Sequence, residues 1–142
     1  MATATQIFSD ASVNRKRGMG FSWVAVQSDK VVARGGGRIP TSENPDFGST
    51  TAEAIGLLSA YKATSELPNR QFFCDSESLA TLTRTRKPSC NPLLAKLVQC
   101  IPVNVQFNNQ SPYIHMVDSQ SKRSHIFDSV RVSDLLDFGI TT

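Results

Sequence analysis

Two acidic residues occupy matching places in two short, similar stretches of this chain. Asp10 ends the run Ile7–Ser9 and Asp75 ends the run Phe72–Cys74, and a serine follows each acid within two residues. Both runs have the composition of β-strands. If the strands are parallel neighbours, the two carboxylates emerge at the same end of the sheet. Either Asp alone could simply form an Asx turn, so the matched pair is what favours a site.

A third carboxylate, Glu53, belongs to a helical pattern that lies between these two strands. It falls on the same stripe as Gly56 and Leu57, and such a stripe faces a core. A carboxylate there is costly unless it is paired or binds a metal. The alternative is that Glu53 closes a capping box at the start of its own helix. Gly56 would let the helix approach the sheet closely. Three acids gathered in one place need a cation, which favours metal-dependent chemistry.

Composition is typical of one globular domain, predicted over residues 1–142, with 39% hydrophobic residues and a net charge of +3. This mildly basic balance permits a nucleic-acid partner without requiring one. Cysteines 74, 90 and 100 form an odd set without a C-x-x-C pair, which favours reduced thiols in a cytoplasmic or nuclear protein. The first residues lack the features of a signal peptide and no run is long enough to span a membrane, so we expect no membrane association.

The predicted elements follow the order of an α/β domain. The first three strands form an antiparallel meander, with a turn over residues 11–18, and a helix then leads to a fourth strand by a parallel crossover. The fifth strand lies at either 103–107 or 113–117, or both segments are strands, and 118–124 is a loop. The predicted strands cover residues 4–10, 20–27, 31–37 and 71–75, and the predicted helices cover 50–65, 76–83, 93–100 and 126–138.

Three short motifs resemble those of the ribonuclease H family. Asp10-Ala11-Ser12 matches the family's D-x-S, Thr51-Ala52-Glu53 resembles its helix opening, and Asp75-Ser76 matches its T-D-S. The element order is also similar to that of the family over essentially the full chain. The resemblance implies a ribonuclease H-like α/β fold. Its five-stranded mixed sheet would have an antiparallel meander followed by two parallel strands, flanked by helices.

The resemblance implies a metal-dependent endonuclease that hydrolyses the RNA strand of RNA–DNA hybrids. Asp10, Glu53, Asp75 and Asp134 would hold two Mg²⁺ ions, for which Mn²⁺ would substitute. Asp134 is chosen because the segment around it is similar to the opening of the family's closing helix, and Asp118 and Asp128 remain alternatives.

Further roles follow only from the resemblance. The family's mobile histidine corresponds best to His125, and His115 is the alternative. Basic side chains would hold phosphates of the DNA strand, and small polar groups would contact the RNA strand. The candidate substrate-binding residues are Ser12, Asn14, Arg15, Arg17, Ser76 and Arg84.

Two other functions are compatible with the same residues. One is a DNA nuclease of the resolvase or integrase type, against which the D-x-S motif weighs. The other is a catalytically inactive module that binds nucleic acid or protein, against which the three intact acids weigh. We expect a monomer, either free-standing or a domain of a viral or retroelement polyprotein.

Overall fold

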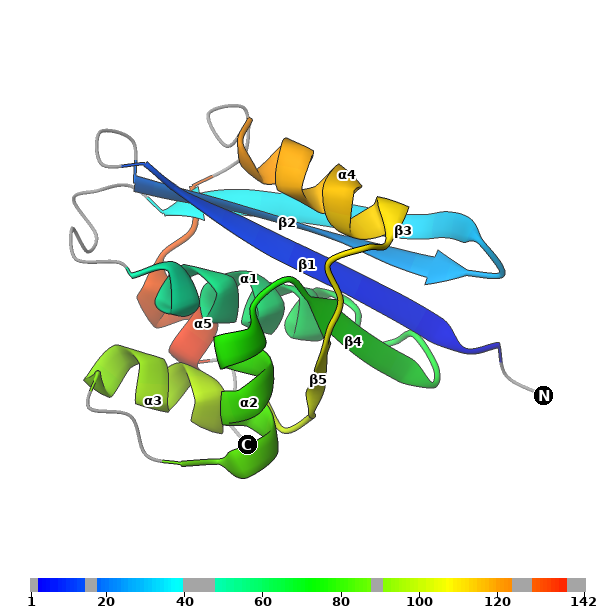
Figure 1. Cartoon of the computed structure of the whole chain (residues 1–142). Coiled ribbons are helices and arrows are strands. Elements are labelled where there is room, and N and C mark those ends of the chain that lie inside the picture. Colours follow the sequence, from blue (N-terminus) through cyan, green and yellow to red (C-terminus); the bar gives the residue numbers. More distant parts are fainter. Residues whose placement is uncertain (1–2, 15–17, 40–47, 88–90, 124–128, 138–142) are drawn as a thin grey trace.

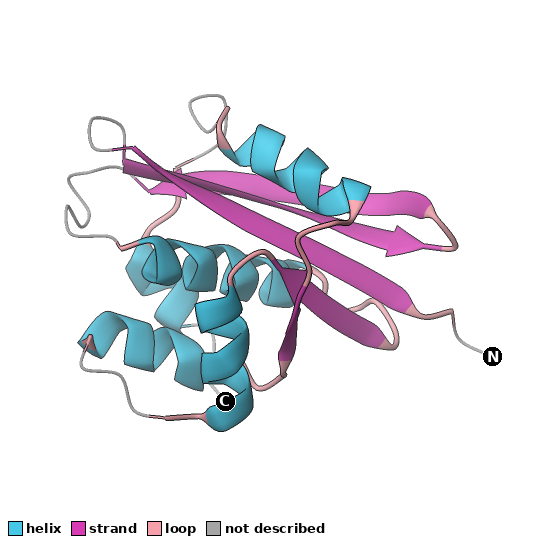
Figure 2. Ribbon diagram, viewed as in Figure 1, coloured by secondary structure: helices cyan, strands magenta, loops and turns pink. Residues whose placement is uncertain are grey.

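One mixed sheet of five strands, with helices on both faces, organises the chain in the computed structural model (Figures 1 and 2). The structure describes residues 3–14, 18–39, 48–87, 91–123 and 129–137. The strands are β1 (Thr5–Asn14), β2 (Gly18–Gln27), β3 (Lys30–Ile39), β4 (Arg70–Cys74) and β5 (Val105–Phe107). Their order in the sheet is β3-β2-β1-β4-β5, with β1 to β3 antiparallel and β4 and β5 parallel to β1. This is the mixed sheet that the sequence predicts.

The first hairpin is longer than the sequence predicts. β1 runs on to Asn14, which pairs with Gly18, so the turn predicted over 11–18 is wrong for residues 11–14. The antiparallel ladder to β2 holds these polar residues in extended conformation despite their turn-like composition. Asp10 therefore lies within β1 and not at its end.

The strand on the other side of β1 is much shorter. β4 pairs with β1 in the parallel register Phe8↔Phe73 and Ser9↔Cys74, and it ends there. Beyond that point β1 continues without a neighbour on the β4 side. Asp75 is the residue that follows β4, so the predicted match between Asp10 and Asp75 is confirmed by the register. Asp10 is thus the first residue of β1 beyond its last pair with β4.

Helix α1 (Ser49–Ala63) packs on one face of β1 and β2. Gly56 lies directly against the sheet: a Cβ at this position would stand 3.1 Å from Phe21 Cβ and 3.4 Å from the backbone oxygen of Asp10. The close approach predicted for this helix is thus observed. It brings Glu53, one turn earlier, to the Ala11 amide next to Asp10.

The C-terminal third differs from its prediction. Of the two candidate fifth strands, 103–107 contains β5, whereas 113–117 lies in helix α4 (Pro112–Ser121). Ser111 caps this helix by accepting a hydrogen bond from the Tyr113 amide, and Pro112 occupies the first turn. Much of the predicted loop 118–124 is therefore helical. Helix α4 covers the face of β1 and β2 opposite α1 (Figure 1).

The remaining helices are α2 (Glu77–Thr85), α3 (Pro92–Gln99) and α5 (Val132–Asp137). α5 packs against α1 and is shorter than the closing helix predicted over 126–138, of which residues 126–128 and 138 lie outside the described part. In the described part of the chain, no helix has the length and apolar character needed to cross a bilayer.

Candidate active site

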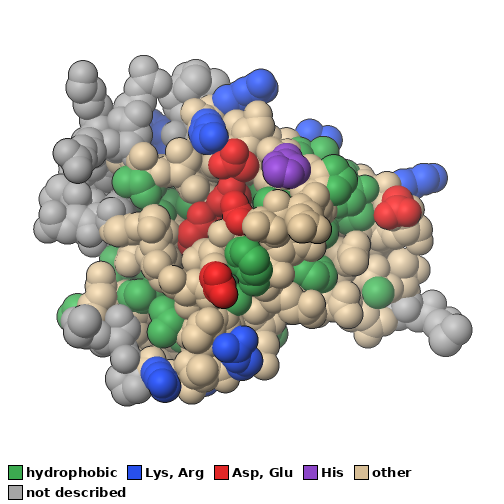
Figure 3. All heavy atoms as spheres, viewed as in Figure 1, with side chains coloured by type: hydrophobic (Ala, Val, Ile, Leu, Met, Phe, Trp, Pro, Cys, Tyr) green, Lys and Arg blue, Asp and Glu red, His purple; other side chains and the backbone are tan. Residues whose placement is uncertain are grey.

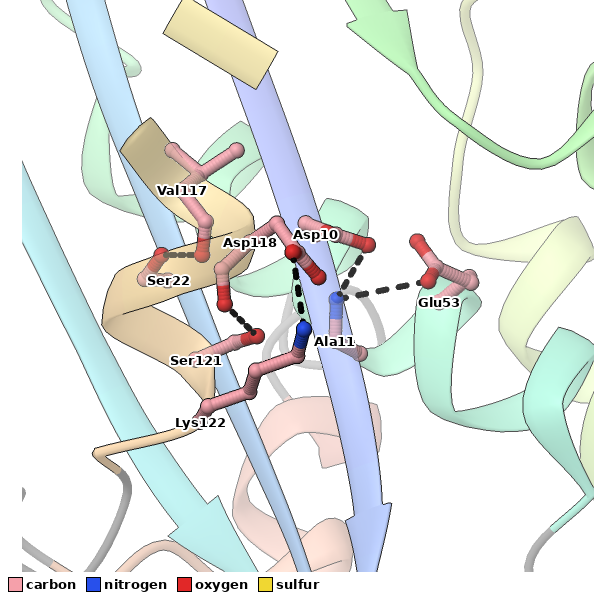
Figure 4. A network of polar contacts seen from close by, with 8 residues as sticks. All are labelled: Asp10, Ala11, Ser22, Glu53, Val117, Asp118, Ser121 and Lys122. Atoms are coloured by element: carbon pink, nitrogen blue, oxygen red, sulfur yellow. Dashed lines mark hydrogen bonds and ion pairs between the residues drawn. The ribbon is translucent and has the colours of Figure 1, made fainter. Parts of the chain in front are cut away.

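Asp10 is the centre of the candidate site. It shares a strand face with Phe8, whose ring packs in the core beneath α4, and only 4% of Asp10 is exposed. The amide of Ala11 donates to Asp10 Oδ1 at 2.8 Å and to Glu53 Oε1 at 3.3 Å (Figure 4). One backbone N–H, at the edge of β1 beyond the end of β4, thus holds two carboxylates together.

Glu53 reaches this amide from α1, on the other face of the sheet. The capping-box alternative is excluded, because the N-cap residue Gly48 has no side chain and no side-chain cap bond is formed. The second oxygen of Glu53, Oε2, is buried and has no hydrogen-bond partner. A buried carboxylate oxygen without a donor is unfavourable, so this atom faces a position that a cation would stabilise.

Burial changes the protonation of both acids. Desolvation raises the pKa of Asp10, even though hydrogen bonds from its surroundings lower it. Desolvation also raises the pKa of Glu53, and a side-chain hydrogen bond with Asp10 and the negative charge of Asp10 add to that effect. Two neighbouring carboxylates repel each other when both are ionised. A bound cation would offset this repulsion and lower the pKa of both groups.

A third carboxylate, Asp118, approaches from α4. It raises the pKa of Asp10 through a side-chain hydrogen bond and through its charge. The Asp118 side chain is 42% exposed, and its Oδ2 accepts a hydrogen bond from Lys122 Nζ at 3.1 Å, one helical turn later. Figure 4 shows Asp118 directed toward Asp10 from the side opposite Glu53.

One cross-strand pair positions both Asp10 and Asp118. Ser22 of β2 pairs directly with Asp10, and its buried hydroxyl donates to the backbone oxygen of Val117 at 2.7 Å. Val117 precedes Asp118 in α4, so this hydrogen bond joins the helix that contains Asp118 to the strand that pairs with Asp10. The contact joins residues that are 95 positions apart in the sequence.

Asp75 completes the group at the end of β4. It is exposed, and its charge also raises the pKa of Glu53. Ser76, which follows it, caps α2 by accepting a hydrogen bond from the Leu79 amide at 3.1 Å. The serine after Asp75 thus has a structural role, and a role in binding substrate stays a prediction.

The comparisons with known proteins agree with this fold. No protein-family model and no curated protein matches the sequence. Among solved structures, RNase H1 from the archaeon Halobacterium salinarum matches with a TM-score of 0.69 and 16% identity, over 86% of this chain and 97% of its own. The N-terminal RNase H domain of a Mycobacterium tuberculosis protein matches with a TM-score of 0.68 and 17% identity, over 87% and 94%. The chain has the ribonuclease H fold.

A larger protein contains the same ribonuclease H fold as one part. A foamy viral protease-reverse transcriptase, solved in complex with an RNA/DNA hybrid, matches 87% of this chain with a TM-score of 0.65 and 10% identity. Only 20% of the viral chain is covered. At these identities the likeness establishes the fold, and function must be argued from the site.

On this ribonuclease H fold, Asp134 lies exposed in the first turn of α5, a helix that packs on α1. Its predicted place among the metal ligands stays a prediction. The charges that act on the two buried acids come from each other, from Asp118 and from Asp75. The sequence missed Asp118 as first choice because its helix was predicted as strand and loop. The Ser111–Pro112 helix start was the available signal.

The other predicted site residues are spread more widely. His115 lies exposed on α4, one turn before Asp118, and not in an apolar strand as predicted. Ser12 is half-buried on β1, and Arg84 lines an open groove between α2 and β5. The side chain of Asn14 and all of Arg15, Arg17, His125 and Asp128 lie outside the described residues.

Acidic side chains gather at the centre of the face shown in Figure 3, with basic side chains at its borders. Within the described ranges, no three His, Cys, Asp or Glu side chains are close enough to form a complete ion site. Asp10 and Glu53 meet at the Ala11 amide, Asp118 interacts with Asp10, and Asp75 acts on Glu53 through its charge. The arrangement is therefore a group of four interacting carboxylates.

Proposed function

We propose that this chain is a divalent-metal-dependent nuclease that hydrolyses the RNA strand of RNA–DNA hybrids. The observation that carries the proposal is the meeting of Asp10 and Glu53 at the Ala11 amide, with Asp75 and Asp118 beside them. Proteins that match this fold include RNase H1 and a reverse transcriptase in complex with an RNA/DNA hybrid, which supports the choice of substrate.

The donor set fits Mg²⁺ or Mn²⁺. All four groups are carboxylates, and hard divalent cations prefer oxygen ligands. Glu53 Oε2 has no hydrogen-bond partner, and the pKa values of Asp10 and Glu53 are raised. A carboxylate metal site has these two features when no cation is bound. Asp10, Glu53, Asp75 and Asp118 would hold two ions between them. This assigns the fourth position to Asp118 in place of Asp134.

Bound divalent ions would supply an activated water at neutral pH and stabilise the leaving oxygen of the phosphodiester. The chain's own residues prepare the site for that chemistry. The Ala11 amide orients Asp10 and Glu53, and their burial keeps bulk water away from the inner side. Asp75 and Asp118 stand on the solvent side, where a phosphate would enter.

The test is a cleavage assay with matched acid variants. Purified protein is incubated with labelled RNA–DNA hybrid, double-stranded RNA and double-stranded DNA in Mg²⁺ or Mn²⁺. We expect cleavage of the hybrid alone, and a loss of at least about a hundredfold in Asp10→Asn and Asp118→Asn. Asp134→Asn is the control: the same chemical change on an exposed helix should leave the rate within about twofold.

Each other outcome selects a different function. Cleavage of DNA would indicate a DNA nuclease of this fold, and metal binding without cleavage would indicate a binding module. A loss in Asp134→Asn equal to that in Asp118→Asn would overturn the assignment of the fourth acid. The single-domain organisation, the monomeric state and the cytoplasmic or nuclear location stay predictions.

A further inference from the structure

The acid that faces solvent at the candidate site already has a positive partner. Lys122 Nζ donates to Asp118 Oδ2 at 3.1 Å, from the position one helical turn later on α4. The Lys122 side chain is 64% exposed and the Asp118 side chain 42%. The ammonium therefore lies next to the carboxylate that interacts with Asp10 (Figure 4).

A divalent cation and this ammonium cannot use the same carboxylate oxygen together. Their like charges would also stand within a few ångströms of one another, where repulsion is appreciable even in water. We propose that Lys122 is a built-in counter-ion of Asp118 that competes with the divalent cation and so sets the metal concentration at which the site fills. The inference rests on the proposed function only in taking the four acids as the cation site.

The character of the pair suits such competition. An exposed ion pair at i and i+4 on a helix is worth only about 0.3–0.5 kcal/mol, so a divalent ion can displace it. The lysine stem is flexible and lies mostly in solvent, so the ammonium can leave without disturbing the core. The helix nevertheless keeps it within reach, because Asp118 belongs to α4 and Lys122 is the C-cap residue of the same helix. Buried Glu53 has no such partner at its Oε2.

The test is the affinity for Mn²⁺, measured by titration calorimetry on chelator-treated protein. Lys122→Gln removes the charge and keeps most of the stem, and we expect its Kd for Mn²⁺ to fall about three- to tenfold. Lys122→Arg keeps the charge and should stay within about twofold of the wild type. Lys96→Gln changes an equally exposed lysine on α3 and should leave the Kd unchanged.

Two further arms separate competition from a general effect on the helix. Raising KCl screens the exposed pair, so the difference between wild type and Lys122→Gln should shrink. In an Asp118→Asn background, Lys122→Gln should no longer change the Kd, because the two residues act as one coupled unit. Thermal unfolding without metal should change little in Lys122→Gln.

An unchanged or weaker Mn²⁺ affinity in Lys122→Gln would overturn the inference, as would a wild type that binds no Mn²⁺ at millimolar concentration. If the wild type cleaves the hybrid but Lys122→Gln has the same Kd for Mn²⁺ as the wild type, the proposed function stands and only this inference is overturned. If Lys122→Gln binds Mn²⁺ more tightly but the protein cleaves no hybrid, this inference stands and the proposed function is overturned.

Discussion

Two helices bring acids to β1 from opposite faces of the sheet, and they do so in opposite ways. On the α1 side, Glu53 is half-buried, and its Oε2 atom is fully buried without a hydrogen-bond partner. On the α4 side, Asp118 is half in solvent and bonded to Lys122. The first acid has a position fixed by close packing, and the second has a partner and room to move.

The difference indicates which of the two acids lowers the stability of the metal-free protein. A buried acid without a counter-charge must either take up a proton or destabilise the fold, whereas an exposed paired acid does neither. We therefore expect the α1 side to dominate the stability of the metal-free protein. The α4 side should instead control how tightly metal binds, with little effect on folding.

Glu53→Gln gives the largest expected effect on stability. In metal-free buffer at pH 8 we expect the variant to be more stable than the wild type by about 3 kcal/mol, because the neutral amide avoids the cost of burying Glu53. The measurement is thermal or urea unfolding in the presence of a chelator. Millimolar Mg²⁺ should stabilise the wild type and not the variant, since ligands stabilise only the state that binds them.

The pH dependence fixes the sign of this effect. The pKa of Glu53 is raised by burial in the folded protein, so above pH 5 the unfolded chain loses a proton that the folded protein keeps. The free energy of unfolding of the wild type should therefore fall as the pH rises from 5 to 8. Asp10, whose pKa is raised as well, acts in the same direction. A gain in Glu53→Gln that is as large at pH 5 as at pH 8 would contradict this account.

Gly56→Val should remove the close approach that places Glu53. A Cβ at this position already stands 3.1 Å from Phe21 Cβ, so two further methyl groups must push α1 away from β1. Overpacking of this kind costs about 2 kcal/mol, measured by urea unfolding. The control is Ala63→Val, at the exposed end of the same helix, which should cost under about 1 kcal/mol. Equal costs at the two positions would mean that Gly56 is not a contact point.

The sequence predicts the α1 side of the site better than the α4 side, for a physical reason. Asp10, Glu53 and Asp75 are placed by local patterns: a strand, a helical stripe with Gly56, and a second strand. The parallel crossover that joins them has few alternatives. The sheet order and the close packing of α1 were therefore predictable.

The position of Asp118 depends on contacts that no local pattern contains. Residues 113–117 alternate as a strand would, and they are helical because Ile114, Val117 and Ser121 are buried against a sheet face formed 95 residues earlier, where Ser22 also bonds Val117. The choice of Asp134 as the fourth acid rests only on the residues next to it in the sequence. Tertiary packing decided which acid lies beside Asp10.

Ser22→Ala tests the tie between β2 and α4. Its buried hydroxyl donates to the Val117 oxygen at 2.7 Å, and we expect the loss to cost about 1 kcal/mol in urea unfolding and to weaken Mn²⁺ binding through Asp118. Ser59→Ala is the matched control, since that hydroxyl is also buried but bonds Ile55 of its own helix. A Ser59→Ala variant that weakens Mn²⁺ binding as much as Ser22→Ala would show that the tie has no special role.

Asp118→Asn should have the smallest effect on folding and a large one on metal. Without metal, the variant loses an exposed ion pair with Lys122 and also the repulsion between Asp118 and Asp10, so its free energy of unfolding should stay within about 0.5 kcal/mol of the wild type. Its Kd for Mn²⁺ should nevertheless rise about tenfold or more, because an amide is a weaker ligand than a carboxylate for a hard cation. Glu53→Gln should also lose metal binding, but with a large change in metal-free stability that Asp118→Asn does not show. If both variants changed stability and metal affinity in the same proportion, the proposed difference between Glu53 and Asp118 would be wrong.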